Sequence, residues 1–381
     1  MREDLRVRGS GGRGCRHCRY RRVRRSLRSR SAPSSRRRDG AAMNVRRHTR
    51  HASARMPVGA APFVALVVLA AMSACTGAPV PAASPSDATA DATGAGPAAS
   101  GAFDPDMVDS AGLVDIGGGR ELFLECSGTG SPTVVLISGA GVAADNWGYA
   151  VADAGASVES AMPSDSAVFP ATARFTRVCA YDRPGTQPWD GSAGGSTPVP
   201  QPTTTQADAA DLEALLTAAE IPGPYVVVGH SLGGLIATTF ARTHPDDVSG
   251  VVLVDPASQF LQTALPPEVW SRWMQSVAEA GAKHPELESP DYPSSIAALD
   301  ATPPLPPMPA AVLSADQPFD FLGIGDADAY WPQWLEAHAL LAASLGATHV
   351  TTTNSGHFVA NVSPALVIEQ ICAVVAPADG C

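Results

Sequence analysis

Residues 225–234 read YVVVGHSLGG and carry the clearest structural signal in the chain. Its first four residues predict a buried strand, and Ser231 follows between Gly229 and Gly233. A chain that turns directly from a strand into a helix needs small residues beside the turn, because the backbone reverses sharply and the helix packs closely. Apolar residues then recur at helical spacing up to Phe240, and Pro245 ends the pattern. The stretch therefore predicts a strand, a sharp turn that presents a serine hydroxyl, and a helix.

The remainder of the body alternates between strand-like and helix-like segments. Several strand runs are continuously apolar, as expected where helices cover both faces of a sheet. The alternation predicts one α/β domain over residues 103–381 with a mostly parallel, eight-stranded sheet. The expected strands are 113–116, 121–126, 133–137, 177–181, 225–228, 251–254, 310–313 and 349–352, and the expected helices are 208–219, the helix after Ser231, 330–344 and 365–375.

Charge divides the chain into two unlike parts. Nineteen arginines and three acidic residues precede Cys75. The rest of the chain contains only seven basic residues but 34 acidic ones. A strongly acidic surface repels nucleic acid, so no nucleic-acid partner is expected for the body. The sequence also lacks a phosphate-binding loop, a dinucleotide glycine fingerprint and paired metal-ligand spacings in the body, so no cofactor or metal is expected.

The N-terminal part is typical of an export leader. Residues 1–42, rich in arginine and serine and without hydrophobic periodicity, predict a disordered basic tract, which we interpret as an over-extended translation start. Residues 43–75 combine a basic segment, a short apolar run over 58–72 and the ending MSAC, which predicts a signal peptide with a lipobox and lipidation of Cys75. The alternative is a plain secretory peptide. Residues 76–102, rich in Ala, Pro, Ser, Thr and Gly, predict a flexible linker. We therefore expect an exported protein, either a lipoprotein on the outer face of the cell membrane or a secreted one.

Six motifs in order resemble those of an α/β-hydrolase of the exported actinobacterial lipoprotein type. They are PTVVLISGAG at 132–141, VCAYDRPG at 178–185, the stretch around Ser231, VLVDP at 252–256, VLSAD at 312–316 and SGH at 355–357. The resemblance covers roughly residues 113–375 and implies an α/β-hydrolase fold with a small cap inserted at about 257–309. Trp270, Trp273 and Met274 lie in that cap in an amphipathic pattern.

The resemblance also implies a set of site residues. Ser231 would be the nucleophile and His357 the base that takes its proton, because a serine hydroxyl attacks an acyl carbon only with such help. The acid that orients the base would be Asp316, which follows the penultimate strand, with Asp255 as the runner-up. The backbone N–H groups of Leu232 and Ala140 would form the oxyanion hole.

Four cysteines lie in the body beyond Cys75, an even number that suggests disulfides in an exported chain. Their spacing alone allows three pairings. In the fold that the resemblance implies, the second and fourth strands are neighbours, which pairs Cys126 with Cys179 and leaves Cys372 with Cys381. In the turn after the fourth strand, Asp182 and Arg183 are interpreted as structural.

The resulting hypothesis is a serine hydrolase, an esterase or lipase-like enzyme that cleaves a small-molecule carboxylic ester through an acyl-enzyme. An aminopeptidase and a cofactor-free perhydrolase of the same fold would use the same residues. A non-catalytic surface lipoprotein that serves as a binding module is the alternative from another class. Natural substrate and oligomeric state are not determined by the sequence.

The lipobox makes one prediction that can be tested directly. Cys75→Ala should release the protein from the membrane fraction, because the variant lacks the thiol that would carry the lipid. Cell fractionation followed by immunoblotting measures this, and a variant that stays in the membrane fraction would contradict lipidation at Cys75.

Overall fold

The computed structural model describes residues 109–153, 155–320, 327–376 and 381. The predicted basic tract, signal peptide, lipidation site and linker lie outside these residues. Within the described part of the chain, no helix is both long enough and apolar enough to span a membrane.

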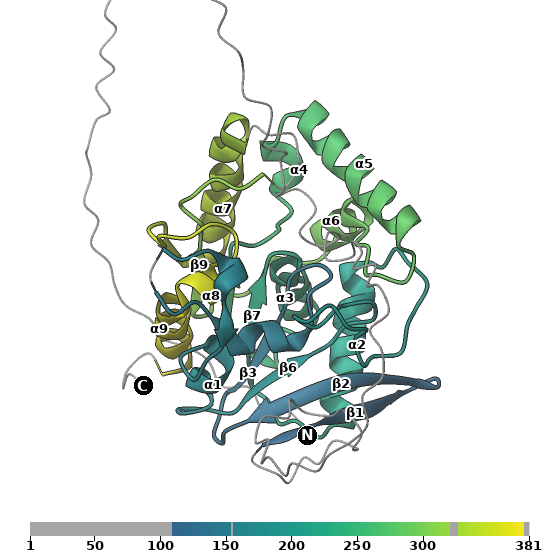
Figure 1. The fold of residues 1–381 in the computed structure, drawn as a ribbon, viewed down its shortest axis with the longest axis vertical. Coiled ribbons are helices and arrows are strands. Elements are labelled where there is room, and N and C mark those ends of the chain that lie inside the picture. Colours follow the sequence, from purple (N-terminus) through teal and green to yellow (C-terminus); the bar gives the residue numbers. More distant parts are fainter. Residues whose placement is uncertain (1–108, 154, 321–326, 377–380) are drawn as a thin grey trace, which may run out of the picture. The chain divides into compact units, whose positions relative to one another are not determined.

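The centre of the structure is an eight-stranded sheet in the order β1-β2-β6-β3-β7-β8-β9-β10 (Figure 1). The first two pairings, β1 with β2 and β2 with β6, are antiparallel, and all the others are parallel. The expected α/β-hydrolase architecture is therefore confirmed. The strands are β1 Ser110–Gly117, β2 Arg120–Ser127, β3 Thr133–Ile137, β6 Val178–Tyr181, β7 Tyr225–His230, β8 Val248–Val254, β9 Ala310–Leu313 and β10 Thr348–Val350.

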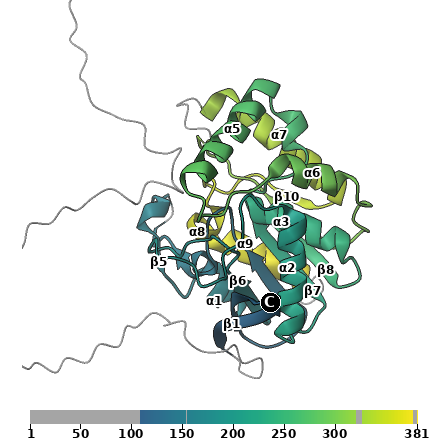
Figure 2. The ribbon, with the colours of Figure 1, turned by 90° about the vertical axis from the view of Figure 1, so that its right-hand side faces the viewer.

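Two pairs of helices cover the sheet and explain why its central strands are apolar throughout. On one side α3 (Leu232–Thr243) packs on β3, β7 and β8 and against α2 (Thr205–Ala218). On the other side α9 (Pro364–Val375) packs on β7, β8 and β9 and against α1 (Val168–Thr172) (Figures 1 and 2). Every residue of β3 and β6 is buried, as strands covered on both faces require.

The segment between β8 and β9, residues 257–309, is called the cap segment below. It contains α4 (Leu261–Ala264), α5 (Pro267–Lys283) and α6 (Tyr292–Asp300). These helices lie beyond the end of the sheet where β7 leads into α3 (Figure 1). The helix α7 (Trp331–Leu345), which follows β9, contacts α4 and also packs on β9 and β10. The shorter elements are β4 Tyr149–Ala150, β5 Met162–Pro163, α8 Val359–Val362 and single helical turns at Ala144–Gly148, Val158–Ser160 and Ala327–Ala329.

Both predicted disulfides are present in the structure. Cys126 and Cys179 are register partners on the antiparallel strands β2 and β6, with their Cα atoms 4.1 Å apart. Cys372 and Cys381 are joined with a Cα separation of 5.6 Å, which ties α9 to the last residue of the chain. The first bridge thus links the antiparallel edge of the sheet to its parallel centre.

Candidate active site

Ser231 lies between β7 and α3 in a strained backbone conformation, with φ 52° and ψ −122°. The glycines beside it are required by close approach. A Cβ on Gly229 would lie 2.2 Å from the carbonyl oxygen of Gly233, and one on Gly233 would lie 2.1 Å from that of Ile137 in β3. The turn predicted from the sequence is therefore tight enough that the helix α3 meets the ends of both β7 and β3.

Two backbone hydrogen bonds connect this turn to the neighbouring strand β8. The N–H of Ser231 donates to the carbonyl of Val254 at 3.1 Å, and the N–H of Ala257 donates to the carbonyl of Ser231 at 2.8 Å. Asp255 lies between Val254 and Ala257, which both bond to Ser231, so these bonds bring Asp255 close to the serine.

His357 lies on the loop after β10, and its ring contacts Asp255. Nδ1 of His357 is 2.6 Å from Oδ2 of Asp255, whose side chain is fully buried. The other carboxylate oxygen accepts hydrogen bonds from the N–H of Ala315 at 2.9 Å and from Nε1 of Trp334 at 3.3 Å. Burial opposes the charged form of Asp255, but the hydrogen bond from His357 and the neighbouring charges outweigh it and lower the pKa of this carboxyl.

The expected pairing of Asp316 with His357 is wrong. Both oxygens of Asp316 accept backbone N–H groups from the loop after β10, those of Thr353 at 3.1 Å, Asn354 at 3.0 Å and Ser355 at 3.0 Å. The physical reason is strand order: β8, whose last residue Val254 directly precedes Asp255, is paired with β7, whereas β9, which leads to Asp316, is one strand further away. Asp316 therefore holds the loop that carries His357 without reaching its ring.

Two aromatic rings fix the position of His357. Phe319 stacks on it with 4.3 Å between ring centroids. The ring of His230, the last residue of β7, has its centroid 4.6 Å from that of His357. Burial lowers the pKa of His230 to about 3, so this ring is neutral, and its Nε2–H donates to the carbonyl of His357 at 2.9 Å. His230 thus supports the loop of His357 without adding a charge beside it.

The two expected oxyanion donors lie on backbone that approaches Ser231. A Cβ on Gly139 would lie 3.2 Å from the Cβ of Ser231, so the loop of Gly139, Ala140 and Gly141 passes directly beside the serine. Among the described residues, no acceptor takes up the N–H of Ala140 or of Leu232. The hydroxyl of Ser231 and the ring of His357 are not hydrogen-bonded in the structure. Catalytic hydrogen bonds of this kind often form only when substrate binds.

Ser231 and His357 line one cavity of about 860 Å³. Ala140 and Asn146 of the body and Trp273 of the cap segment also line it. Most of its wall is apolar or aromatic. No lysine or arginine is among the described residues that line the cavity, while four carboxylates are. The aromatic lining residues are Trp189, Trp273, Tyr292, Phe319, Trp334 and Phe358, and the carboxylates are Glu159, Asp190, Glu288 and Asp320.

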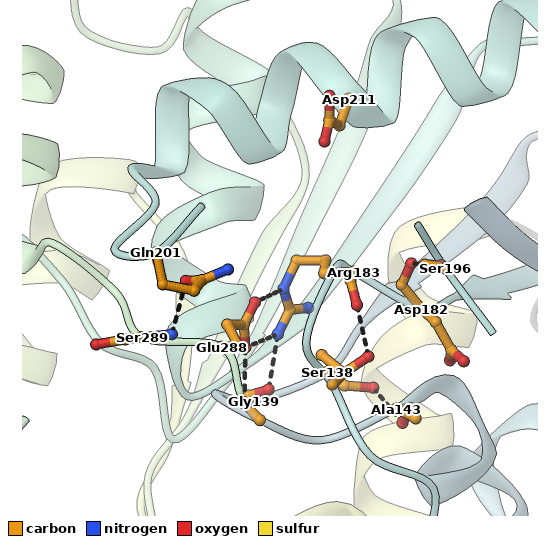
Figure 3. A network of polar contacts seen from close by, with 12 residues as sticks. Ser138, Gly139, Ala143, Asp182, Arg183, Ser196, Gln201, Asp211, Glu288 and Ser289 are labelled. Atoms are coloured by element: carbon orange, nitrogen blue, oxygen red, sulfur yellow. Dashed lines mark hydrogen bonds and ion pairs between the residues drawn. The ribbon is translucent and has the colours of Figure 1, made fainter. Parts of the chain in front are cut away.

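Two groups that shape this site, Glu288 and Phe319, are not predicted by any sequence motif. Glu288 of the cap segment forms a buried ion pair with Arg183 next to the loop of Ala140 (Figure 3). Phe319 covers the ring of His357. Neither residue lies in a recognisable motif, and in the described part of the chain no cluster of side chains suits a metal ion.

A family model described as the alpha/beta hydrolase family matches residues 134–370. Over 63 residues the chain is 46% identical to Lipase LipV of Mycobacterium tuberculosis, an alignment that covers 16% of this chain and 24% of that protein. Over 82 residues it is 42% identical to a pimeloyl-[acyl-carrier protein] methyl ester esterase of Chromobacterium violaceum, covering 21% of this chain and 32% of that protein. Alignments with the curated relatives span between 14% and 42% of the relatives' lengths.

Among solved structures, that of carboxylesterase CesB from Bacillus subtilis aligns with 71% of this chain and 93% of its own, with a TM-score of 0.46 and 16% identity. Because the family model covers more than half of the sequence, the chain belongs to the alpha/beta hydrolase family.

Proposed function

We propose that the protein is a serine hydrolase that cleaves carboxylic esters, with Ser231 as nucleophile, His357 as base and Asp255 as the acid that orients the base. The observation that carries this proposal is the 2.6 Å contact between His357 and a fully buried Asp255, in a cavity that also contains Ser231 on its strained turn. The names of two relatives, a lipase and a methyl ester esterase, support ester hydrolysis as the reaction.

The chemistry follows from these positions. His357 Nε2 takes the proton of Ser231 as its Oγ attacks the ester carbon, and the carbonyl oxygen becomes an oxyanion near the N–H groups of Ala140 and Leu232. The protonated ring then gives its proton to the departing alcohol, which leaves an acyl group on Ser231. Water, deprotonated by His357, cleaves that acyl-enzyme and restores the serine. The ionised Asp255 accepts Nδ1–H throughout, which keeps Nε2 free to accept the proton.

The wall of the cavity favours uncharged substrates. Six aromatic side chains line it, and the described lining residues offer no lysine or arginine to pair with an anion. A carboxylate bound there would lose water without gaining a lysine or arginine as partner and would share the cavity with Glu159, Asp190 and Asp320. An ester with an apolar or uncharged acyl group therefore fits best.

The role of Ser231 predicts a selective covalent reaction. Ser231→Ala should abolish labelling by a fluorophosphonate probe, because that reagent reacts with an activated serine hydroxyl. Ser258→Ala is the matched control, since its buried hydroxyl has no hydrogen-bond partner among the described residues and its loss leaves the site unchanged. In-gel fluorescence measures both, and a wild-type protein that takes up no probe would favour the binding-module alternative.

The contacts of the two carboxylates predict unequal effects of their substitution. Asp255→Asn should lower kcat by about 10³–10⁴-fold, because an amide stabilises the wrong tautomer of the histidine. Asp316→Asn should keep kcat within about tenfold and reduce thermal stability instead, since its oxygens hold backbone N–H groups. Steady-state kinetics and thermal unfolding separate the two effects. A larger loss of kcat in Asp316→Asn than in Asp255→Asn would contradict the role of Asp255 and favour Asp316 as the acid.

The charge of the cavity predicts discrimination against anionic acyl groups. With 4-nitrophenyl hexanoate and the mono-4-nitrophenyl ester of adipate, kcat/KM should be at least about tenfold higher for the neutral ester, equal to about 1.4 kcal/mol. The two acyl chains have the same length and differ only by a terminal methyl or carboxylate. Rates of alkaline hydrolysis correct for intrinsic reactivity, and equal kcat/KM values would contradict the charge argument.

A further inference from the structure

We propose that the buried pair Arg183–Glu288 positions the N–H of Ala140 for oxyanion stabilisation, so that the cap segment completes the active site. This proposal rests on the proposed function, because it assigns a role to two residues that do not touch the reacting atoms. It makes Arg183 and Glu288 positioning residues.

The pair itself is fully enclosed. Nε of Arg183 donates to Oε1 of Glu288 at 2.6 Å and Nη2 donates to Oε2 at 3.0 Å, and both side chains are 1% exposed (Figure 3). Burial alone would lower the pKa of Arg183, but the charge of Glu288 and the hydrogen bonds to it more than compensate and raise this pKa. The guanidinium therefore stays charged and its planar fork is held in one orientation.

The same two side chains bind the loop on both sides of Ala140. Nη2 of Arg183 also donates to the carbonyl oxygen of Gly139 at 2.7 Å, and Oε2 of Glu288 accepts the N–H of Gly141 at 2.6 Å. Figure 3 shows Arg183 and Glu288 together against Gly139. A tripeptide whose flanking groups are both bound to one rigid pair has little freedom to rotate at its centre.

The carbonyl of Gly139, which accepts Nη2 of Arg183 at 2.7 Å and the N–H of Val142 at 3.2 Å, determines the direction of the Ala140 N–H. The carbonyl of Gly139 and the N–H of Ala140 belong to one planar trans peptide group, in which the two point in opposite directions. Arg183 holds that oxygen on its own side, so the N–H of Ala140 points away from Arg183. A donor fixed before the reaction needs no reorientation when the oxyanion forms, which is what makes such a group effective.

Backbone contacts hold Glu288 in place from the cap side. Its N–H donates to the carbonyl of Gly185 at 2.9 Å, and the N–H of the next residue, Ser289, donates to Oε1 of Gln201 at 2.9 Å. Gly185 has φ +85°, and a Cβ there would lie 2.5 Å from the nitrogen of Glu288. The backbone of the cap segment at Glu288 is thus held directly against the turn after β6.

A role in stability alone does not account for these contacts. Replacing a buried ion pair by apolar side chains of similar size is often neutral or stabilising, whereas removing one partner is costly. What an apolar pair lacks is the directional hydrogen bonds to Gly139 and Gly141. Stability and loop geometry therefore respond differently to different substitutions, and this difference provides the test.

The first test measures single variants of the full chain. Glu288→Gln should lower kcat by about 10–100-fold with KM within about threefold, since the loss of one oxyanion donor costs about 10²–10³-fold. The amide keeps one acceptor oxygen, so it loses either the bond from Nε of Arg183 or the two bonds that Oε2 accepts from Nη2 of Arg183 and the N–H of Gly141, and its own N–H group then faces a donor. Asp211→Asn is the matched control: Asp211 accepts a hydrogen bond from Arg120 at 2.8 Å, and neither residue contacts the loop of Ala140.

The second test separates positioning from stability. The double variant Arg183→Met/Glu288→Leu should be thermally more stable than Glu288→Gln. Its kcat should nevertheless be as low as that of Glu288→Gln. Recovery of kcat together with stability, or equal kcat values for Glu288→Gln and Asp211→Asn, would overturn the proposal.

A third measurement keeps the result independent of substrate. Hydrogen exchange followed by mass spectrometry should show faster exchange of the peptide containing Gly141 in Arg183→Met/Glu288→Leu, which has no acceptor for that N–H, and no change in Asp211→Asn. Unchanged exchange in Arg183→Met/Glu288→Leu would also overturn the proposal. If the wild-type protein neither hydrolyses 4-nitrophenyl hexanoate nor reacts with a fluorophosphonate, the proposed function fails, while the exchange result still reports whether the pair holds the loop.

Discussion

The strained backbone at Ser231 is the constraint on which the rest of the site depends. A positive φ at a residue with a side chain costs about 1–3 kcal/mol and persists only where the surroundings enforce it. Here α3 packs against the ends of β3 and β7 through Gly233 and Gly229, and hydrogen bonds to β8 hold the serine on both sides. Because three adjacent strands fix the turn, the loops that follow β3 and β8 are brought beside the serine.

Much of the fold could be predicted from the sequence because its central strands are uninterrupted apolar runs. All eight expected strands and the four expected helices are present within a few residues of the expected bounds. The helix α2 begins three residues before the expected position 208, because Thr204 caps it: the hydroxyl of Thr204 accepts the N–H of Ala207. The short helix α6 is not among the expected helices, since it lies in a proline-rich stretch that does not favour a helix.

The site was less predictable than the fold, because local sequence does not record strand order. Asp255 and Asp316 each follow an apolar strand, and nothing near either residue shows which strand is the neighbour of β7. Glu288 was beyond sequence reasoning, because it lies 105 residues from Arg183 and its environment exists only once the cap segment has folded onto the turn after β6. Ser231 could be predicted from the sequence, because the glycines that its sharp turn requires lie within two residues of it along the chain.

The contact between Glu288 and Gly185 bears on how such a chain can be altered. Cap segments are natural targets for exchange between related hydrolases, because they line the cavity and are inserted between two strands. In this chain the inserted segment also supplies an acceptor to the loop beside the serine, and Gly185 of the body is shaped to receive it. A transplanted cap would therefore have to bring its own carboxylate to the same place, and the body that receives it would need a glycine at the point of contact.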